Sequence, residues 1–360
     1  MDTTSAKEQI EGDYVKYTRR KVIFVLLCFA ICVIAIGSSV TVGGRTLSFV
    51  EVYETIFNHI LGEQPQPGTS EWMDDYIVWD VRLPRALFAI VAGAGLAVAG
   101  ATMQSVMKNP LADAYTTGIS SGACFGVAIA AVLGVSVMNG TMSSISVVNA
   151  FIFSLLPMVA IVLIAPRENI SPATLILAGT ALSYLFNSLT TIILSFTDSE
   201  TLATVYEWQI GTLTDISWEC IPIPLIVTIV GTATMVVLSK KLNVLSLGDD
   251  QATALGLSVE RMRLILLILI SLIVASVIAY AGIIGFIGLV SPHIVRILID
   301  SDNRFVIPGS ALFGAAFLLL CDIIVRLISD VETVPVGVVV SFIGAPIFLY
   351  LIIRQSKSMW

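Results

Sequence analysis

The side chains that could do chemistry are few in this sequence, and their spacing favours ion pairing over catalysis. Asp322 and Arg326 stand four residues apart inside an apolar run, so on a helix they share a face and can form an ion pair. Two more arginines, Arg82 and Arg85, stand at the start of another apolar run. Charged groups at such positions are costly in lipid, which makes each a candidate for function as well as for structure.

The other reactive residue types form no catalytic or metal-binding pattern. The two histidines, His59 and His293, are far apart, and the five cysteines form no Cys-x-x-Cys pair. An enzyme needs clustered catalytic groups, and a metal site needs ligands at characteristic spacings. We therefore expect no catalytic residue and no protein-bound metal, and we interpret the cysteines as small buried apolar residues.

The elements that must position these residues are membrane spans. Of the 360 residues, 56% are hydrophobic and only 12% are charged, well below the roughly 25% of soluble domains. The net charge of −7 argues against nucleic acid as a partner. The apolar runs long enough, or nearly so, to cross lipid as helices lie near 22–41, 84–104, 116–134, 147–165, 172–196, 219–239, 263–281, 283–299, 307–327 and 335–353.

We therefore predict an all-α integral membrane protein with about ten transmembrane helices. The run near 283–299 is the weakest candidate, because it carries Pro292, His293 and Arg296 and follows its neighbour almost without a loop.

Basic residues set the expected orientation of the spans. Ten spans put both termini on one side. If that side is the cytoplasm, all but four of the 19 Lys and Arg residues fall inside. The exceptions are Arg45, Arg82, Arg85 and Arg326. We predict a multi-pass protein of the cell (inner or plasma) membrane with a cytoplasmic tail at 1–21, one transmembrane domain at 22–354 that includes an outer loop at 41–80, and a cytoplasmic tail at 355–360.

Small residues mark two packing sites. Ala89, Gly93, Ala97 and Ala101 recur every four residues and give the second span a smooth stripe, which predicts close contact with a neighbouring helix. Residues 281–288 hold three glycines shortly before Pro292. That stretch is typical either of close packing or of a break between two short helices.

The polar stretch at 245–258 predicts a short helix that binds a protein partner. Asp249 and Asp250 suit a first turn, Gly256 suits the end, and Leu247 and Leu255 leave apolar contacts on the surface. Helices that lie on lipid are typically rich in Lys and Arg, and this stretch has none. The chain also lacks the G-x-x-x-x-G-K-[ST] phosphate-binding loop, so ATP, if it drives this protein, binds to another polypeptide.

Several sequence blocks, in the expected order, resemble the FecCD-type permeases of ABC importers for iron–siderophores, haem and cobalamin. The resemblance runs from about residue 78 to residue 354. The blocks are Arg82-Leu83-Pro84-Arg85, Asn109-Pro110-Leu111-Ala112-Asp113, Trp208-Gln209-Ile210-Gly211, Leu247-Gly248-Asp249-Asp250, Ser291-Pro292-His293, Asp322 with Arg326, and Pro335-Val336-Gly337. Two positions depart from the pattern: Lys108 replaces a frequent Arg, and Ser291 replaces a branched apolar residue.

The resemblance implies a homodimer with a translocation path along its two-fold axis. It implies two ATP-binding subunits on the cytoplasmic face, which bind ATP and Mg, and one solute-binding protein on the outer face. The chain itself would hold no cofactor and catalyse no reaction. The implied cargo is an iron–siderophore, haem, cobalamin or a similar metal chelate.

The resemblance also implies roles for particular residues. Arg82, Arg85 and Arg326 match the arginines that receive acidic residues of the binding protein. Residues 245–258 match the coupling helices that sit in a groove of the ATPase, and Ser171, Pro172 and Ala173 fall at a cytoplasmic gate. The expected coupling residues are Leu247, Gly248, Asp249, Asp250, Ala252, Leu255 and Gly256.

Two other classes of function find less support in the residues. An ion-driven secondary transporter needs acidic or polar groups at mid-membrane and often shows internal repeats. No chain of acidic residues runs through the spans of this sequence. A membrane enzyme needs clustered catalytic groups, which two distant histidines do not provide.

Overall fold

The chain is helical throughout the part that the structure describes. The computed structural model describes residues 3–43, 45, 47–63, 65–134, 142–164, 171–328 and 334–356, and the side chains of these apart from 3–17, 142–145 and 354–356. The helices are α1 (Thr3–Thr41), α2 (Phe49–Ile60), α3 (Ser70–Tyr76), the π-helical turn η1 (Ile77–Arg82), α4 (Leu83–Met107), η2 (Ala114–Thr117), α5 (Ile119–Leu133), α6 (Met142–Ile164), α7 (Pro172–Leu194), α8 (Ser199–Ile210), η3 (Trp218–Cys220), α9 (Pro222–Val237), α10 (Ser239–Ser246), α11 (Asp249–Ala254), α12 (Val259–Ala281), α13 (Ile287–Ile299), α14 (Asn303–Ile328) and α15 (Val336–Ser356).

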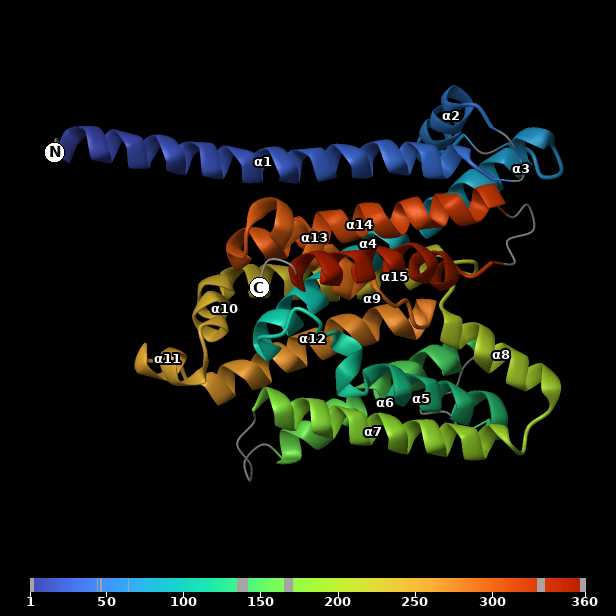
Figure 1. The fold of residues 1–360 in the computed structure, drawn as a ribbon. Coiled ribbons are helices and arrows are strands. Elements are labelled where there is room, and N and C mark those ends of the chain that lie inside the picture. Colours follow the sequence, from blue (N-terminus) through green and yellow to red (C-terminus); the bar gives the residue numbers. More distant parts are fainter. Residues whose placement is uncertain are drawn as a thin grey trace.

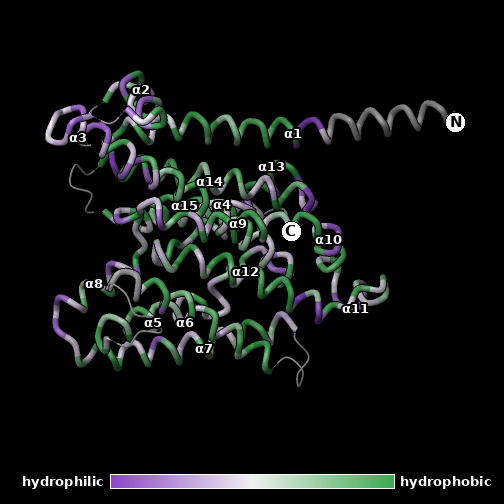
Figure 2. Tube along the Cα trace, turned by 180° about the vertical axis from the view of Figure 1, so that it is seen from behind, coloured by the Kyte–Doolittle hydropathy of each residue, from purple (hydrophilic) through white to green (hydrophobic). Residues whose placement is uncertain are grey.

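The predicted fold class is confirmed. Within the described residues, eight helical stretches are long and apolar enough to cross a membrane, and α5 and α13 are shorter apolar helices. Each of the ten predicted spans coincides with one of these helices. They lie side by side along one direction, with α2 and α3 at one end of the bundle and α10 and α11 at the other (Figure 1). Apolar residues follow the middle of the helices, and polar residues gather towards the ends (Figure 2).

The first helix is longer than the predicted span. It begins at Thr3 and runs without interruption to Thr41, so residues 3–21, expected as a tail, continue the first span as a helix. α1 begins, and α15 ends, on the side of the bundle where α10 and α11 lie (Figure 1). An even number of crossings explains why both ends of the chain lie on that side.

Helix α4 is the centre of the bundle, because small residues let two neighbours approach its backbone. In its most apolar stretch 83% of residues are buried, against 17% in α7. A Cβ atom on Gly93 would overlap the carbonyl oxygen of Gly314 in α14, and one on Gly100 would overlap that of Gly288 in α13. Lipid gives helices no hydrophobic reason to associate, so such close contacts supply the packing. The predicted stripe is a helix–helix contact.

The stretch at 281–288 is a break between two helices. α12 ends at Ala281 and α13 begins at Ile287. Gly282 and Phe286 have φ values of +68° and +64°, in the left-handed region that a continuous helix excludes. The amide of Thr212 donates to the carbonyl oxygen of Ala281 (2.9 Å), which satisfies an acceptor at the end of α12. Both readings that the sequence left open are observed, since the helix breaks here and Gly288 packs closely against Gly100 of α4.

A buried ionic cluster joins three helices near the α2–α3 end. Asp322 in α14 is fully buried and accepts hydrogen bonds from Arg85 Nε of α4 (2.8 Å) and Arg326 Nε of α14 (3.1 Å). Arg326 also donates to the carbonyl oxygen (2.7 Å) and hydroxyl (2.8 Å) of Ser39 in α1. The predicted Asp322–Arg326 pair is present. Arg85 is a further partner of the same carboxylate, and the cluster ties α1, α4 and α14 together.

We predict that Asp322→Asn lowers the stability of the fold. Removing the carboxylate leaves two buried guanidinium groups without their shared counter-charge, and breaking such a pair costs about 3–5 kcal/mol. The measurement is thermal unfolding of the purified variant in mild detergent, in which we expect a clearly lower midpoint than for the unaltered protein.

The matched control is Asp198→Asn. Asp198 is exposed and caps α8, a role that asparagine fills equally well. Changing Arg85, Asp322 and Arg326 together to leucine is expected to cost less than Asp322→Asn, because no uncompensated charge remains. An Asp322→Asn midpoint equal to that of the control would show that the cluster does not hold the three helices.

Candidate functional site

The α10–α11 segment presents apolar side chains to the surface at one end of the bundle. As predicted, Asp249 and Asp250 form the first turn of a short helix, α11. The turns on either side use Gly248 (φ +124°) and Gly256 (φ +82°), conformations that residues with a Cβ rarely adopt. The side chains of Leu247 and Leu255 are 57% and 65% exposed. Exposed leucines on either side of a short helix at the end of the bundle are typical of a surface that another protein covers.

Asp249 fixes this segment to the bundle. Its Oδ1 atom accepts from Arg263 Nη2 of α12 (2.9 Å) and from Lys108 Nζ at the end of α4 (3.0 Å). Partial burial raises the pKa of Asp249, but hydrogen bonds from Arg263 and Lys108 outweigh it and hold the pKa below its ordinary value. The carboxylate therefore stays ionised at neutral pH. Ala252, one turn later on the same face of α11, is fully buried, so this face of the helix is held against the bundle.

The predicted gate residues form the start of α7. Ser171 accepts a hydrogen bond from the amide of Thr174 (3.1 Å) as the N-cap, and Pro172 occupies the first turn. Ala173 is exposed. These residues thus have a clear role in starting the helix. The preceding residues 165–170 lie outside the described part of the chain, and the gating role stays a prediction.

The three arginines predicted to dock a binding protein lie inside the protein. Arg82, Arg85 and Arg326 are 5%, 2% and 4% exposed. Arg82 donates to the carbonyl oxygens of Val40 (2.9 Å) and Thr41 (3.1 Å), the last residues of α1, and thereby caps that helix. With Arg85 and Arg326 bound to Asp322, no member of the set is presented at the surface in this conformation. The sequence could not show this, because the acceptors of Arg82 lie about 40 positions earlier in the chain.

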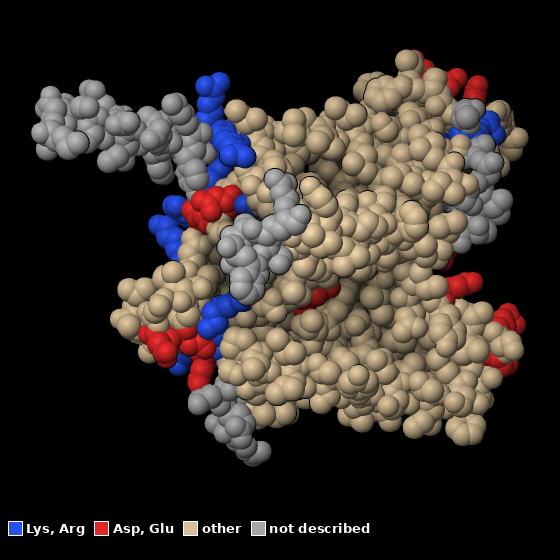
Figure 3. All heavy atoms as spheres, in the orientation of Figure 1, with Lys and Arg blue, Asp and Glu red and all other residues tan. Residues whose placement is uncertain are grey.

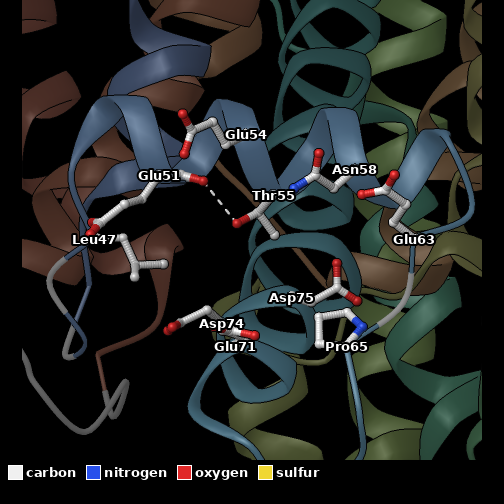
Figure 4. Close-up of a pocket in the computed structure, with 10 residues that line it drawn as sticks. All are labelled: Leu47, Glu51, Glu54, Thr55, Asn58, Glu63, Pro65, Glu71, Asp74 and Asp75. Carbon is white, nitrogen blue, oxygen red and sulfur yellow. Dashed lines mark hydrogen bonds between the residues drawn. The ribbon is translucent and has the colours of Figure 1, made fainter.

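The segment at 41–80, expected as an outer loop, contains the helices α2 and α3. Ser48 and Glu51 cap the start of α2 reciprocally, and His59 Nδ1 lies 2.9 Å from Asp75 Oδ1 of α3. Arg45 pairs with Asp74 of α3. Between α2 and α3 lies a pocket of about 560 Å³ whose wall holds the carboxylates of Glu51, Glu54, Glu63, Glu71, Asp74 and Asp75 (Figure 4).

Charged residues gather at the two ends of the molecule, and mostly uncharged residues cover the middle of this face (Figure 3).

A wide apolar recess lies where the α12–α13 break meets α15. It has a volume of about 710 Å³ and includes Ile210, Ile283 and Gly285 on one side and Val338 and Phe342 of α15 on the other. Phe342 is 81% exposed and Val338 45% exposed. This recess was not predicted from the sequence. Its only signal was the broken small-residue stretch at 281–288, which opens the space beside α15.

Comparisons with known proteins identify the family. The model of the FecCD transport family matches residues 27–354, most of the chain. The hemin transport system permease protein of Yersinia pestis is 33% identical, over 92% of this chain and 95% of that protein. The cobalamin import system permease protein of Halobacterium salinarum is 36% identical, over 77% of this chain and 73% of that protein.

A solved structure shares the fold. It is described as an inward-facing conformation of a transporter assigned to the metal-chelate type of ABC transporters. It superposes with a TM-score of 0.79 at 29% identity, covering 92% of this chain and 98% of that one. Because the family model spans nearly the whole sequence and the fold agrees, this chain belongs to the FecCD transport family and is a multi-pass membrane permease subunit of an ABC transporter, not an enzyme.

Proposed function

We propose that this chain is the membrane-spanning subunit of a binding-protein-dependent importer that moves a metal chelate into the cytoplasm. The observation that carries the proposal is the α10–α11 segment, in which two exposed leucines flank the short helix α11 that Asp249 holds against the bundle. A surface held in place in this way suits a separate ATP-binding subunit, because closure of that subunit on ATP must move the helices of the bundle. The α10–α11 end then faces the cytoplasm, and the acidic α2–α3 end faces outward.

In this proposal two copies of the chain form the transporter. The recess beside α15 leaves Phe342 and Val338 uncovered, and a second copy across a two-fold axis would enclose it as a path. Two ATPase subunits would bind ATP and Mg below, and one solute-binding protein would deliver cargo above. The start of α7 at Ser171, Pro172 and Ala173 would close the path towards the cytoplasm.

The proposed cargo is an iron or cobalt chelate such as an iron–siderophore, haem or cobalamin. Two relatives are named for hemin and for cobalamin, and both cargos are bulky metal chelates built on a large ring. The recess beside α15 is wide and mostly apolar, with Phe342, Val338 and Ile283 in its wall. Such a lining suits the passage of a bulky apolar molecule, because it offers few fixed polar contacts that would hold the cargo in place.

The test of the proposal is co-purification from the native membrane. We expect the tagged chain, extracted in mild detergent, to carry an ATPase with a Walker motif in equal amount, identified by mass spectrometry. Cargo follows from the metal and chelate content of any captured binding protein. A chain that remains alone, even after cross-linking from residues 247–257, would contradict the proposal and favour an ion-driven transporter.

We predict that Leu247→Asp with Leu255→Asp uncouples the ATPase. The change places two charges on the apolar surface where the partner would bury them, and unpaired buried charges oppose association. The measurement is the amount of ATPase that co-purifies, together with ATP hydrolysis by the complex. The control is Leu61→Asp, at a leucine that is 59% exposed at the opposite end of the bundle. Equal ATPase recovery in both variants would remove α10–α11 from the interface.

We also predict that docking of the binding protein depends on Arg82. Docking on Arg82, Arg85 and Arg326 requires the segment 41–80 to move aside, because Arg82 is bound to the end of α1. Arg82→Gln removes the charge and keeps two N–H donors for the carbonyl oxygens of Val40, Thr41 and Arg45 that Arg82 binds. We expect weaker capture of the binding protein in a pull-down, with less dependence on salt. Arg45→Gln is the control at a more exposed arginine of the same end. Unchanged capture by a folded Arg82→Gln variant would exclude Arg82 from docking.

A further inference from the structure

The side chain of Asn243 joins α10 to the start of α14. Its Nδ2 group donates to Asp302 Oδ1 (2.8 Å), and its Oδ1 atom accepts from the amide of Asn303 (2.9 Å). Asp302 also accepts from the amide of Arg304 (3.0 Å), so it caps α14 while it holds Asn243. An amide that donates and accepts at two neighbouring residues fixes the position of α10 against α14.

From Asn303 the hydrogen bonds continue through α4 into α13. Ser105 of α4 donates to Asn303 Oδ1 (3.0 Å), and the Ser105 hydroxyl accepts from Arg296 Nη2 of α13 (3.2 Å). Arg296 also donates to the carbonyl oxygen of Ala101 (3.1 Å) and to Gln104 Oε1. Gln104 in turn donates to the carbonyl oxygen of Leu289 (3.3 Å), one turn into α13. We call the side chains of Asn243, Asn303, Ser105, Arg296 and Gln104 the polar chain.

The middle of the polar chain is buried, which makes its geometry costly to change, and Asn243 and Arg296 are half-buried. Asn303, Ser105 and Gln104 are 2%, 3% and 3% exposed. A buried polar group that loses its partner costs the full desolvation penalty, and linked hydrogen bonds reinforce one another. α10, α4, α13 and the start of α14 are therefore expected to move as one body.

The two ends of the polar chain lie beside the two elements that the proposed function requires. At one end, Asn243 stands four residues before Leu247, and α11 follows directly. At the other end, α13 begins after the break at Gly282–Phe286, which borders the recess beside α15. Two left-handed residues within five positions form a joint at which α13 can turn relative to α12.

We propose that Asn243 is a positioning residue that transmits movement of the α10–α11 segment through the polar chain to α13 and the recess. The inference rests on the proposed function, since an ATPase must supply the movement. Without the Asn243 contacts, α10 would still carry the ATPase surface at Leu247, but α13 would no longer follow it.

The test follows the recess while the ATPase is trapped with ATP and vanadate. A reporter cysteine at Val338, in the wall of the recess, is labelled with a membrane-impermeant maleimide in the purified complex. The background is Cys220→Ser, because Cys220 is partly exposed and Cys28, Cys32, Cys124 and Cys321 are buried. We expect trapping to change the labelling rate by about fivefold or more with Asn243 present. With Asn243→Ala the change falls below about twofold, and ATPase recovery and basal hydrolysis are kept.

Three further variants separate transmission from damage to the fold. Asn243→Asp with Asp302→Asn exchanges the donor and the acceptor, and asparagine still caps α14, so the full labelling change should return. Ser105→Ala interrupts the polar chain at a second point and should act like Asn243→Ala. Ser246→Ala is the control in the same helix, because the Ser246 hydroxyl donates only to Leu242 of its own helix (2.9 Å).

The outcomes distinguish this inference from the proposed function. A full labelling change with Asn243→Ala would overturn the role of Asn243, and so would loss of ATPase binding, which would mean that Asn243 serves the interface itself. If the reporter does not respond even with Asn243 present while the ATPase co-purifies, the transmission to the recess is wrong and the proposed function stands. If no ATPase is recovered with any variant, the proposed function fails, and the inference fails with it.

Discussion

The structure depends on the close approach of α13 and α14 to the backbone of α4. Gly93 meets Gly314 and Gly100 meets Gly288, with no room for a side chain between the backbones. In lipid the helices gain nothing from hiding apolar surface from one another, so tight contact has to come from residues that are small. The same closeness brings polar groups of α4 within hydrogen-bonding distance of its neighbours.

Polar side chains secure α4 at both of its ends, by different means. Near α2 and α3, Arg85 meets the carboxylate of Asp322 in an ionic cluster. Near α10 and α11, Ser105 and Gln104 both accept hydrogen bonds from Arg296 of α13. They also donate to uncharged groups, Ser105 to Asn303 and Gln104 to the carbonyl oxygen of Leu289. Lipid offers no hydrogen-bond partners, so polar groups in the membrane are stable when they find their partners within the protein, as these do. They fix both ends of α4 to neighbouring helices, and the surfaces of α11 and α15 stay uncovered in the chain.

At the α2–α3 end, contacts within the chain engage the basic side chains. Arg82 caps α1, and Arg45 and His59 lie against the carboxylates of Asp74 and Asp75, so these side chains have partners within the chain. What remains on the surface of α2 and α3 is acidic. Any partner that meets this end first encounters carboxylates, and contact with Arg82 requires the segment to rearrange.

The sequence by itself determined the class, the ten apolar helices, the stripe at Gly93, the Asp322–Arg326 pair and the short helix at Asp249. All of these are local, since apolar length and the four-residue helical period are properties of neighbouring positions. Only the tertiary structure decided that Arg85 shares Asp322, that Arg82 is buried, that residues 281–288 break, and that Asn243 reaches Asn303. These contacts join positions far apart in the chain, and a composition or a period carries no information on which distant residues meet. The same holds for the candidate functional residues. The sequence identified the arginines and the exposed leucines as candidates, and packing determined that the leucines lie at the surface and the arginines inside.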